Sequence, residues 1–306
     1  MSAGIPLPST ESTAPSIEGI RTILVIGSGT MGSQIGMAAA LAGYETTVQD
    51  ISAESLAKAR AELTARMEAT VAKGRLAAAE AEAALGRLSF ATDLDASAAG
   101  ADFVIEAATE RLDIKEQIFA RLGQVAPEHA ILATNSSTLG ASKVAAATGR
   151  PDRVCNMHFF NPALVMKCVE VVRHRATSQA TVETTLELAR RLGKQPVLIN
   201  REVPGFIANR LMGAIQKEAL ALAAAGIASR EDIDTTARTA LGHPMGPFEL
   251  MDMVGLDVID FIAQATYAET GDAADRPDAQ VAALVAEGKL GRKSGQGFYA
   301  YPAPGT

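Results

Sequence analysis

Residues 23–32 decide the fold: they read Ile-Leu-Val-Ile-Gly-Ser-Gly-Thr-Met-Gly, and a helical pattern follows them through Ala42. An apolar run that ends in a glycine turn is typical of a strand buried on both faces of a parallel sheet. Strand, glycine turn and helix stand in the order of a unit that binds dinucleotide phosphates at the helix N-terminus. In such a unit Gly27 permits the tight turn, Gly29 lets the backbone approach a diphosphate, and Gly32 allows close packing of helix and strand.

An acidic residue stands where this unit uses one. Asp50 ends the next apolar strand pattern, about 20 residues beyond the glycines, where a carboxylate can bond both hydroxyls of an adenosine ribose. Ile51 and Ser52 follow it, and no nearby arginine could accept a 2′-phosphate, so NAD is favoured over NADP. The predicted cofactor-binding residues of this segment are Gly27, Gly29, Thr30, Met31, Gly32 and Asp50. A glycine turn that serves packing alone, with Asp50 as a helix cap, is one alternative, and an FAD site is another.

Short apolar runs alternate with longer helical patterns from Arg21 to about Asn200. Four of these runs are predicted strands, at residues 23–26, 46–48, 102–105 and 131–133. Between the second and the third lies a helical stretch, residues 53–85 with a break at Gly74, which predicts a helix pair that projects from the sheet. After Pro204-Gly205 the strand signals stop, and four helical patterns follow, at residues 206–225, 231–241, 248–270 and 279–287.

These patterns predict an α/β protein. We expect an N-terminal Rossmann-type doubly wound sheet with a helix-pair insertion, followed by an all-helical C-terminal domain. The expected boundaries are a disordered tail at residues 1–19, rich in Ser, Thr and Pro, a dinucleotide-binding domain at residues 20–202 and a helical domain at residues 203–306.

Composition excludes several classes of protein. The chain carries 28 Lys and Arg against 35 Asp and Glu, a net charge of -7, which argues against a nucleic-acid partner. Its longest apolar stretch, residues 219–228, falls short of the roughly 20 residues of a membrane-spanning helix, so we expect no membrane partner. Two cysteines, Cys155 and Cys168, are too few for a disulfide framework or a cysteine-based zinc site. We therefore expect no metal and a reducing compartment, the cytoplasm.

A histidine and a glutamate are predicted to meet in the second half of the sheet. His158 lies in an apolar run, residues 154–162, and Glu170 is the single acid of a second run, residues 165–172. If the runs pair antiparallel about Leu164, residues whose numbers sum to 328 lie opposite each other, as 158 and 170 do. A carboxylate on one ring nitrogen fixes the tautomer and leaves the other nitrogen to take a proton. A buried His-Glu ion pair without chemistry is the alternative.

Several separate motifs together resemble the NAD-dependent 3-hydroxyacyl-CoA dehydrogenases, especially the short 3-hydroxybutyryl-CoA type. They cover nearly everything after the tail, at residues 27–32, 135–137, 158–162, 166–167, 169–171, 204–210, 242–247 and 291–299. The resemblance implies that His158 is the base that takes the proton of the 3-hydroxyl group. It implies that Glu170 orients this base while hydride leaves C3 for the nicotinamide.

The resemblance also implies contacts beyond the glycine turn. It implies substrate contacts for Ser137, Asn209 and Lys73, the last of these with coenzyme A. It implies cofactor contacts for Glu110, Lys115, Ser137, Asn161 and Lys293. Taken alone, Ser137 and the two asparagines are ordinary turn and helix-start residues, and the charged side chains are ordinary solvated surface.

The expected function is the reversible NAD-dependent oxidation of a (S)-3-hydroxyacyl-CoA, of short chain such as 3-hydroxybutyryl-CoA, to the 3-oxoacyl-CoA. One alternative is a related dehydrogenase that acts on 3-hydroxyadipyl-CoA or on a free hydroxy acid, and another is a nicotinamide-binding protein without turnover. The apolar faces of residues 206–225 and 248–270 exceed what one small domain covers. We therefore expect a homodimer through the C-terminal helical domain, as the family also implies.

Overall fold

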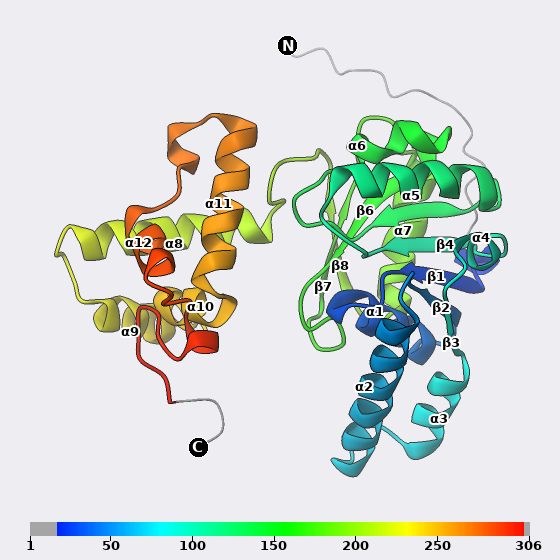
Figure 1. Ribbon diagram of the computed structural model, residues 1–306, viewed down its shortest axis with the longest axis horizontal. Helices are drawn as coiled ribbons and strands as arrows, with labels where there is room; N and C mark the ends of the chain where they lie inside the picture. The colour runs from blue at the N-terminus through cyan, green and yellow to red at the C-terminus, as the bar shows by residue number, and fades with distance from the viewer. Residues whose placement is uncertain (1–16, 303–306) are drawn as a thin grey trace. The chain divides into compact units, whose positions relative to one another are not determined.

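The computed structural model describes residues 17–302 (Figure 1). The chain divides into two compact units, one that ends at Phe206 and one that begins at Ile207. Of the expected tail, residues 1–16 lie outside the described residues, and Ile17–Gly19 form a 3-10 turn, η1. These three residues differ from the expectation because Ile17 packs against the core of the first unit.

The first unit is built on a sheet that has eight strands in the described part of the chain, in the order β3-β2-β1-β4-β5-β6-β7-β8. The strands are β1 (Thr22–Ile26), β2 (Glu45–Gln49), β3 (Leu88–Ala91), β4 (Phe103–Glu106), β5 (Ile131–Thr134), β6 (Val154–Phe159), β7 (Cys168–Val172) and β8 (Gln195–Ile199). Neighbouring strands are parallel except β6 and β7, which are antiparallel. The order reverses between β1 and β4, which is the place where open α/β sheets bind ligands.

Strands β1, β4, β5 and β6 supply side chains to two cores, one on each face of the sheet. In β1, Ile23 and Val25 join the core that also holds side chains of α1, α2, α3 and α7, whereas Leu24 and Ile26 join the core of α4, α5 and α6. These helices are α1 (Thr30–Leu41), α2 (Ala53–Ala72), α3 (Ala78–Gly86), α4 (Leu94–Ala98), α5 (Leu112–Val125), α6 (Ser142–Ala145) and α7 (Gln179–Arg191). Helices cover both faces, so the prediction of a doubly wound α/β sheet is confirmed.

The predicted helix pair is present as α2 and α3, which extend away from the sheet in Figure 1. Ser52 begins α2 by accepting a 3.1 Å hydrogen bond from the backbone N–H of Ser55, as an N-cap does. Gly74, at a φ of +65°, lies in the break between the two helices. The predicted break at Gly74 is therefore correct.

Two strands were not predicted from the sequence, and both lie at edges of the sheet. β3 follows the helix pair directly, and β8 pairs with β7 alone. Both are only partly buried, and β8 begins with Gln195 and Pro196. Their sequences lack the continuous apolar runs that identify the inner strands, because an edge strand has less surface to bury.

The predicted strand at residues 165–172 is shorter in the structure, where β7 begins at Cys168. Residues 165–167 belong instead to the turn that joins β6 to β7. The buried Lys194 holds this turn, because its Nζ donates to the carbonyl oxygens of Ala163 and Met166, at 2.5 and 3.0 Å. Burial and the neighbouring charge of Lys167 lower the pKa of Lys194.

The second unit is helical throughout, as predicted. Its helices are α8 (Ala208–Ala224), α9 (Arg230–Ala240), α10 (Pro247–Val254), α11 (Leu256–Thr270) and α12 (Ala279–Ala286), with 3-10 turns at Ala273–Asp275 and Arg292–Ser294. The single pattern at residues 248–270 is two helices, α10 and α11. They separate at Gly255, whose φ of +105° does not continue a helix.

Two buried carboxylates hold this unit together. Asp234 accepts from the backbone N–H groups of Phe248 and Glu249 at the start of α10. Asp252 accepts from the N–H groups of Phe298 and Tyr299, at 2.9 Å each. Through these hydrogen bonds the motif at residues 291–299 anchors the end of the described chain to α10.

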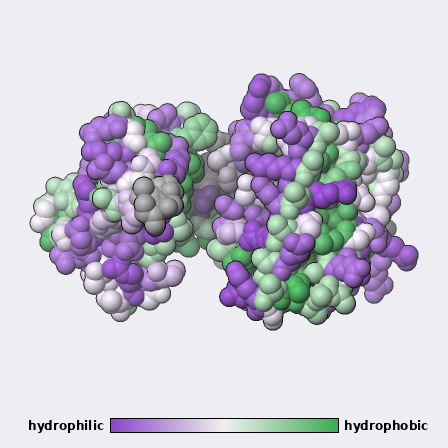
Figure 2. All heavy atoms as spheres, turned by 60° about the horizontal axis from the view of Figure 1, so that its bottom comes forward, coloured by the Kyte–Doolittle hydropathy of each residue, from purple (hydrophilic) through white to green (hydrophobic). Residues whose placement is uncertain are grey.

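The surface shows both hydrophilic and hydrophobic residues (Figure 2). On the face drawn in Figure 2, hydrophilic residues cover much of each unit and hydrophobic ones lie between them. Among the residues that the structure describes, no helix combines the length and apolarity needed to cross a bilayer.

Gly123 in α5 provides a test of the packing around the sheet. An added Cβ there would lie 2.4 Å from the backbone oxygen of Thr148. Alanine in a helix interior is normally favoured over glycine by about 1 kcal/mol, but we expect Gly123→Ala to destabilise the protein by about 1–3 kcal/mol through overpacking. Urea unfolding of both proteins measures this difference in the free energy of unfolding.

The control is Gly86→Ala in α3, where an added Cβ meets nothing within 4 Å. This change should be neutral or stabilising. Equal effects of the two changes would contradict the packing.

Candidate active site

The glycine turn after β1 admits no side chain at two of its three motif glycines. Gly27 has a φ of +97°, and a Cβ at Gly32 would lie 1.9 Å from the carbonyl oxygen of Gly27. No side chain fits at these two positions, because a Cβ at Gly27 would lie 2.6 Å from the backbone oxygen of Ala107 and α1 packs directly on the turn at Gly32. Gly29, in contrast, faces open space, with nothing within 4 Å of an added Cβ. It precedes α1 without a side-chain cap, and Thr30 and Met31 form the first turn of that helix.

Asp50 lies directly after β2 and holds the glycine turn. Its Oδ2 accepts hydrogen bonds from the backbone N–H and the hydroxyl of Ser28, at 2.8 Å each, and Oδ1 accepts from the N–H of Ser52 at 3.0 Å. Burial raises the pKa of Asp50, but the hydrogen bonds from Ser52 and Ser28 outweigh it and leave the pKa below its ordinary value. The side chain is therefore a carboxylate at neutral pH, and a negative charge beside the turn disfavours a 2′-phosphate.

The predicted pairing of His158 with Glu170 is correct. β6 and β7 are antiparallel, and these two residues are direct partners in the register. Nδ1 of His158 lies 2.8 Å from Oε2 of Glu170, and both side chains are buried, with 7% and 2% of their surface exposed. A carboxylate only accepts hydrogen bonds, so Nδ1 carries the proton and Nε2 is the nitrogen that can exchange one.

Two aromatic rings restrict the imidazole. The ring centroid of Phe160 lies 4.6 Å from that of His158, and the centroid of Phe206 lies 5.6 Å away. Phe206 is itself buried against Val172 and Ile199 in the first unit. The imidazole therefore has one charged partner, Glu170, and apolar neighbours beside it.

Ser137 and Glu110 come together at the carboxyl ends of β4 and β5. The backbone N–H of Ser137 donates to Oε1 of Glu110 at 3.3 Å, and the hydroxyl of Ser136 donates to Oε2. Asn135, just before them, accepts a 2.9 Å hydrogen bond from the N–H of Phe159, next to His158. The segment that follows β5 is thus tied both to Glu110 and to the strand of His158.

Lys115 has an environment that the sequence did not indicate. It is 2% exposed, and its Nζ lies 2.5 Å from Oε2 of Glu106 and 3.3 Å from the hydroxyl of Thr134. The other carboxylate oxygen of Glu106 accepts from the N–H of Ala108. In this structure Lys115 is therefore part of a buried ion pair beneath the segment that leads to Glu110.

The other residues with implied roles lie as follows. Asn161 is exposed and precedes Pro162 by a cis peptide bond. Lys73 is exposed at the C-terminal end of α2. In the second unit, Asn209 is half-buried in the first turn of α8, and Lys293 pairs with Asp257, with 2.6 Å between Nζ and Oδ2.

Sequence reasoning did not single out Asn156, whose side chain is fully buried in β6. It accepts from Ala141 and donates to Ser136 and Leu139, all in the segment that carries Ser137. One sequence signal was available: Asn156 stands two residues before His158, so both side chains point to the same face of the strand.

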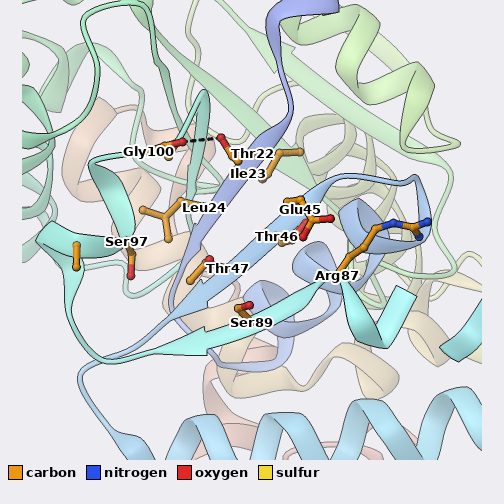
Figure 3. A pocket seen from close by; sticks show the side chains of 12 residues that line it. Thr22, Ile23, Leu24, Glu45, Thr46, Thr47, Arg87, Ser89, Ser97 and Gly100 are labelled. Carbon is orange, nitrogen blue, oxygen red and sulfur yellow. Dashed lines mark hydrogen bonds between the residues drawn. The ribbon is translucent and has the colours of Figure 1, made fainter. Parts of the chain in front are cut away.

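Figure 3 shows a separate pocket of about 240 Å³ in the first unit. Thr22 and Glu45, which line it, begin β1 and β2, whereas the glycine turn follows the carboxyl end of β1. The pocket therefore lies toward the amino ends of the strands, away from Asp50 and His158. Within residues 17–302, no cluster of three or more His, Cys, Asp or Glu side chains is arranged to hold a metal ion.

The two units match two parts of one protein family. The description "3-hydroxyacyl-CoA dehydrogenase, NAD binding domain" fits residues 22–203, and "3-hydroxyacyl-CoA dehydrogenase, C-terminal domain" fits residues 205–301. The chain belongs to the 3-hydroxyacyl-CoA dehydrogenase family. It is thus a member of a family of NAD-dependent oxidoreductases, and the first unit corresponds to the family's NAD-binding part.

Individual relatives in this family have different names. The chain is 42% identical over 285 residues to the 3-hydroxyadipyl-CoA dehydrogenase of Escherichia coli, with 93% of the chain but only 60% of that relative covered. It is 38% identical over 279 residues to the 3-hydroxybutyryl-CoA dehydrogenase of Clostridioides difficile, covering 91% of the chain and 99% of the relative. The solved (S)-3-hydroxybutyryl-CoA dehydrogenase of Ralstonia eutropha is similar with a TM-score of 0.88 and 37% identity, covering 93% of this chain and all of that one.

The lowered pKa of Asp50 predicts an acid-dependent part of the stability. A carboxyl group whose pKa is lower in the folded state stabilises the fold above its ordinary pKa, near 4, and this contribution is lost as the pH falls through the lowered value. The difference in free energy of unfolding between wild type and Asp50→Asn should therefore be constant from pH 5 to 8 and shrink below about pH 4. Urea unfolding across this pH range measures it, and a difference that grows toward acid would contradict the assignment.

Proposed function

We propose that this protein catalyses the reversible oxidation of a (S)-3-hydroxyacyl-CoA of short chain, such as 3-hydroxybutyryl-CoA, to the 3-oxoacyl-CoA. The observation that carries the proposal is the buried pairing of Nδ1 of His158 with Glu170 at 2.8 Å, in a chain of this family. Nε2 of His158 takes the proton of the 3-hydroxyl group in the oxidation and returns it in the reduction. NAD, when bound, supplies the acceptor for the hydride that leaves C3.

Glu170 makes this proton transfer effective. Its carboxylate keeps the proton of the neutral imidazole on Nδ1, so the lone pair is on Nε2. When Nε2 takes the proton, the ring becomes an imidazolium, and the adjacent carboxylate stabilises that charge. The packed rings of Phe160 and Phe206 restrict the orientation of the imidazole, which is 7% exposed.

NAD fits the residues at the end of β1. The open side of Gly29 and the uncapped start of α1 suit a diphosphate, and the ionised Asp50 suits the hydroxyls of the adenosine ribose. We assign Glu110, Ser137, Asn161 and Lys293 to contacts with the nicotinamide half. Lys115 supports this set from within the unit, because it neutralises Glu106 beneath the same segment.

The substrate is a coenzyme A ester in this proposal, with Ser137 and Asn209 near the reacting oxygen and Lys73 near coenzyme A. A second candidate substrate, 3-hydroxyadipyl-CoA, is favoured by the name of the Escherichia coli relative, which is 42% identical. The two candidates differ by a terminal carboxylate on the acyl chain, so they require different surroundings for its end.

We further propose a homodimer through the second unit. Large apolar side chains on α8 and α11 are exposed, among them Leu211 at 62% and Phe261 at 66%. A soluble chain that leaves such residues in water gains by burying them against a second copy. The cytoplasm is the proposed location, since both cysteines of the chain are unpaired, as is typical of a reducing compartment.

The test of the reaction is NADH consumption with acetoacetyl-CoA, longer 3-oxoacyl-CoAs, 3-oxoadipyl-CoA and free 3-oxo acids. We expect turnover with the CoA esters, fastest at short chain length. His158→Ala should lower the rate by about 10²-fold or more while NADH affinity is kept, because only proton transfer is lost. His129→Ala is the control: this histidine pairs with Asp102 just before β4, at the amino end of the strand, so its loss should leave the rate unchanged. Equal rates for wild type and His158→Ala would refute the proposal.

The test of the cofactor site is the choice between NADH and NADPH. Asp50→Ser removes the carboxylate that can accept from both ribose hydroxyls, and with it the negative charge that repels a 2′-phosphate. We expect NADH affinity to fall by about tenfold and the preference for NADH over NADPH to shrink by at least as much. Fluorescence titration of both nucleotides measures it. An unchanged preference would place the adenosine ribose away from Asp50.

A further inference from the structure

Residues 136–141 connect β5 to α6 and carry Ser137. They form neither strand nor helix, so their backbone groups need partners from elsewhere in the protein. The side chain of Asn156 supplies three of these partners. Its Oδ1 accepts from the N–H of Ala141 at 2.7 Å, and its Nδ2 donates to the carbonyl oxygens of Ser136 and Leu139, at 3.3 and 3.1 Å.

The position of Asn156 connects this segment to His158. Asn156 and His158 alternate with residues that enter the opposite core, Cys155 and Met157, so the two polar side chains share one face of β6. Asn156 is 0% exposed, and a buried amide with three well-made hydrogen bonds holds its partners in one arrangement. The segment therefore cannot shift relative to β6 without breaking these bonds.

A second set of contacts holds the same segment from the other side. The carboxylate of Glu110 accepts hydrogen bonds from the hydroxyl of Ser136 and from the N–H of Ser137. The hydroxyl oxygen of Ser136 in turn accepts a hydrogen bond from the N–H of Leu139 at 2.9 Å. Ser137 is thus placed between Glu110 on one side and the peptide held by Asn156 on the other. Its own hydroxyl is left available for a ligand contact.

We propose that Asn156 is a positioning residue: it sets the place of Ser137 relative to His158 by holding residues 136–141 against β6. This inference rests on the proposed function, in which Ser137 contacts both substrate and cofactor and His158 transfers the proton. Asn156 is fully buried, and its amide forms hydrogen bonds with the protein segment that carries Ser137. It acts through Ser137, because a displacement of about 1 Å in a reacting geometry can cost about 10²-fold in rate.

The test is a double-mutant cycle between Asn156 and Ser137. Asn156→Asp keeps the volume of the side chain and the acceptor for Ala141, but it places an oxygen against the two carbonyl groups. We expect Asn156→Asp and Ser137→Ala each to lower kcat/KM for acetoacetyl-CoA and NADH by about 10- to 100-fold. The kcat/KM of the double variant should be close to that of the less active single variant, because both changes remove the same contact of Ser137.

A matched control separates this role from general stability. Cys155→Ala changes the next residue of the same strand, also fully buried, whose Sγ lies 3.5 Å from the hydroxyl of Thr185 in the opposite core. It should lower Tm by a few degrees and leave kcat/KM within about twofold. If Asn156→Asp fails to fold, Asn156→Ser takes its place, since a hydroxyl can keep one of the three bonds.

Hydrogen exchange tests the position of residues 136–141 independently of whether the protein turns over acyl-CoA. Hydrogen exchange of the peptide that covers residues 136–141 should accelerate about tenfold or more in Asn156→Asp and not in Cys155→Ala. Multiplicative losses in the double variant, or a loss in Cys155→Ala equal to that in Asn156→Asp, would overturn the inference. Failure of the proposed function shows separately, as a wild type without turnover of acyl-CoA substrates while the exchange difference persists.

Discussion

The antiparallel register of β6 and β7 is the constraint on which the candidate site depends. His158 faces Glu170 in this register, and a shift of one residue would set valine opposite the imidazole and turn the carboxylate to the other face of the sheet. Such a shift is opposed on the other face of the two strands, since Met157 and Val171 lie in the apolar core there and cannot exchange places with charged neighbours. The hydrophobic pattern of the strands thus secures the position of the polar pair.

A buried lysine stabilises the turn between these strands. Lys194 lies buried just before β8 and donates to two carbonyl oxygens of the turn, so backbone dipoles compensate its charge. At the other end of the site, Lys115 and Glu106 form a buried ion pair beneath the segment of Glu110. Buried ion pairs contribute little net stability, but the loss of one partner is costly, so they favour one arrangement of the backbone around them. Rigid supports of this kind suit a site whose reacting atoms must be placed within fractions of an ångström.

Some features were predicted from the sequence because they depend on neighbours along the chain. The glycine turn, the break at Gly74 and the register of His158 with Glu170 follow from backbone conformation and strand alternation. The edge strands β3 and β8 were missed, since a half-buried strand shows no continuous apolar run. The single helix expected at residues 248–270 was wrong, because one glycine among strongly helical residues did not reveal that Gly255 takes a φ of +105°.

The sequence by itself determined the α/β class, the inner strands, the glycine turn and the pairing of His158 with Glu170, because each of these is a local pattern of residue types and spacing. Only the tertiary structure decided which polar side chains are buried together. Asn156 meets Ser136 and Ala141, and Lys115 meets Thr134, across neighbouring strands and loops whose contacts no spacing encodes. The physical reason is that a buried polar group must find a partner in space, and that partner is selected by the packing of the whole sheet.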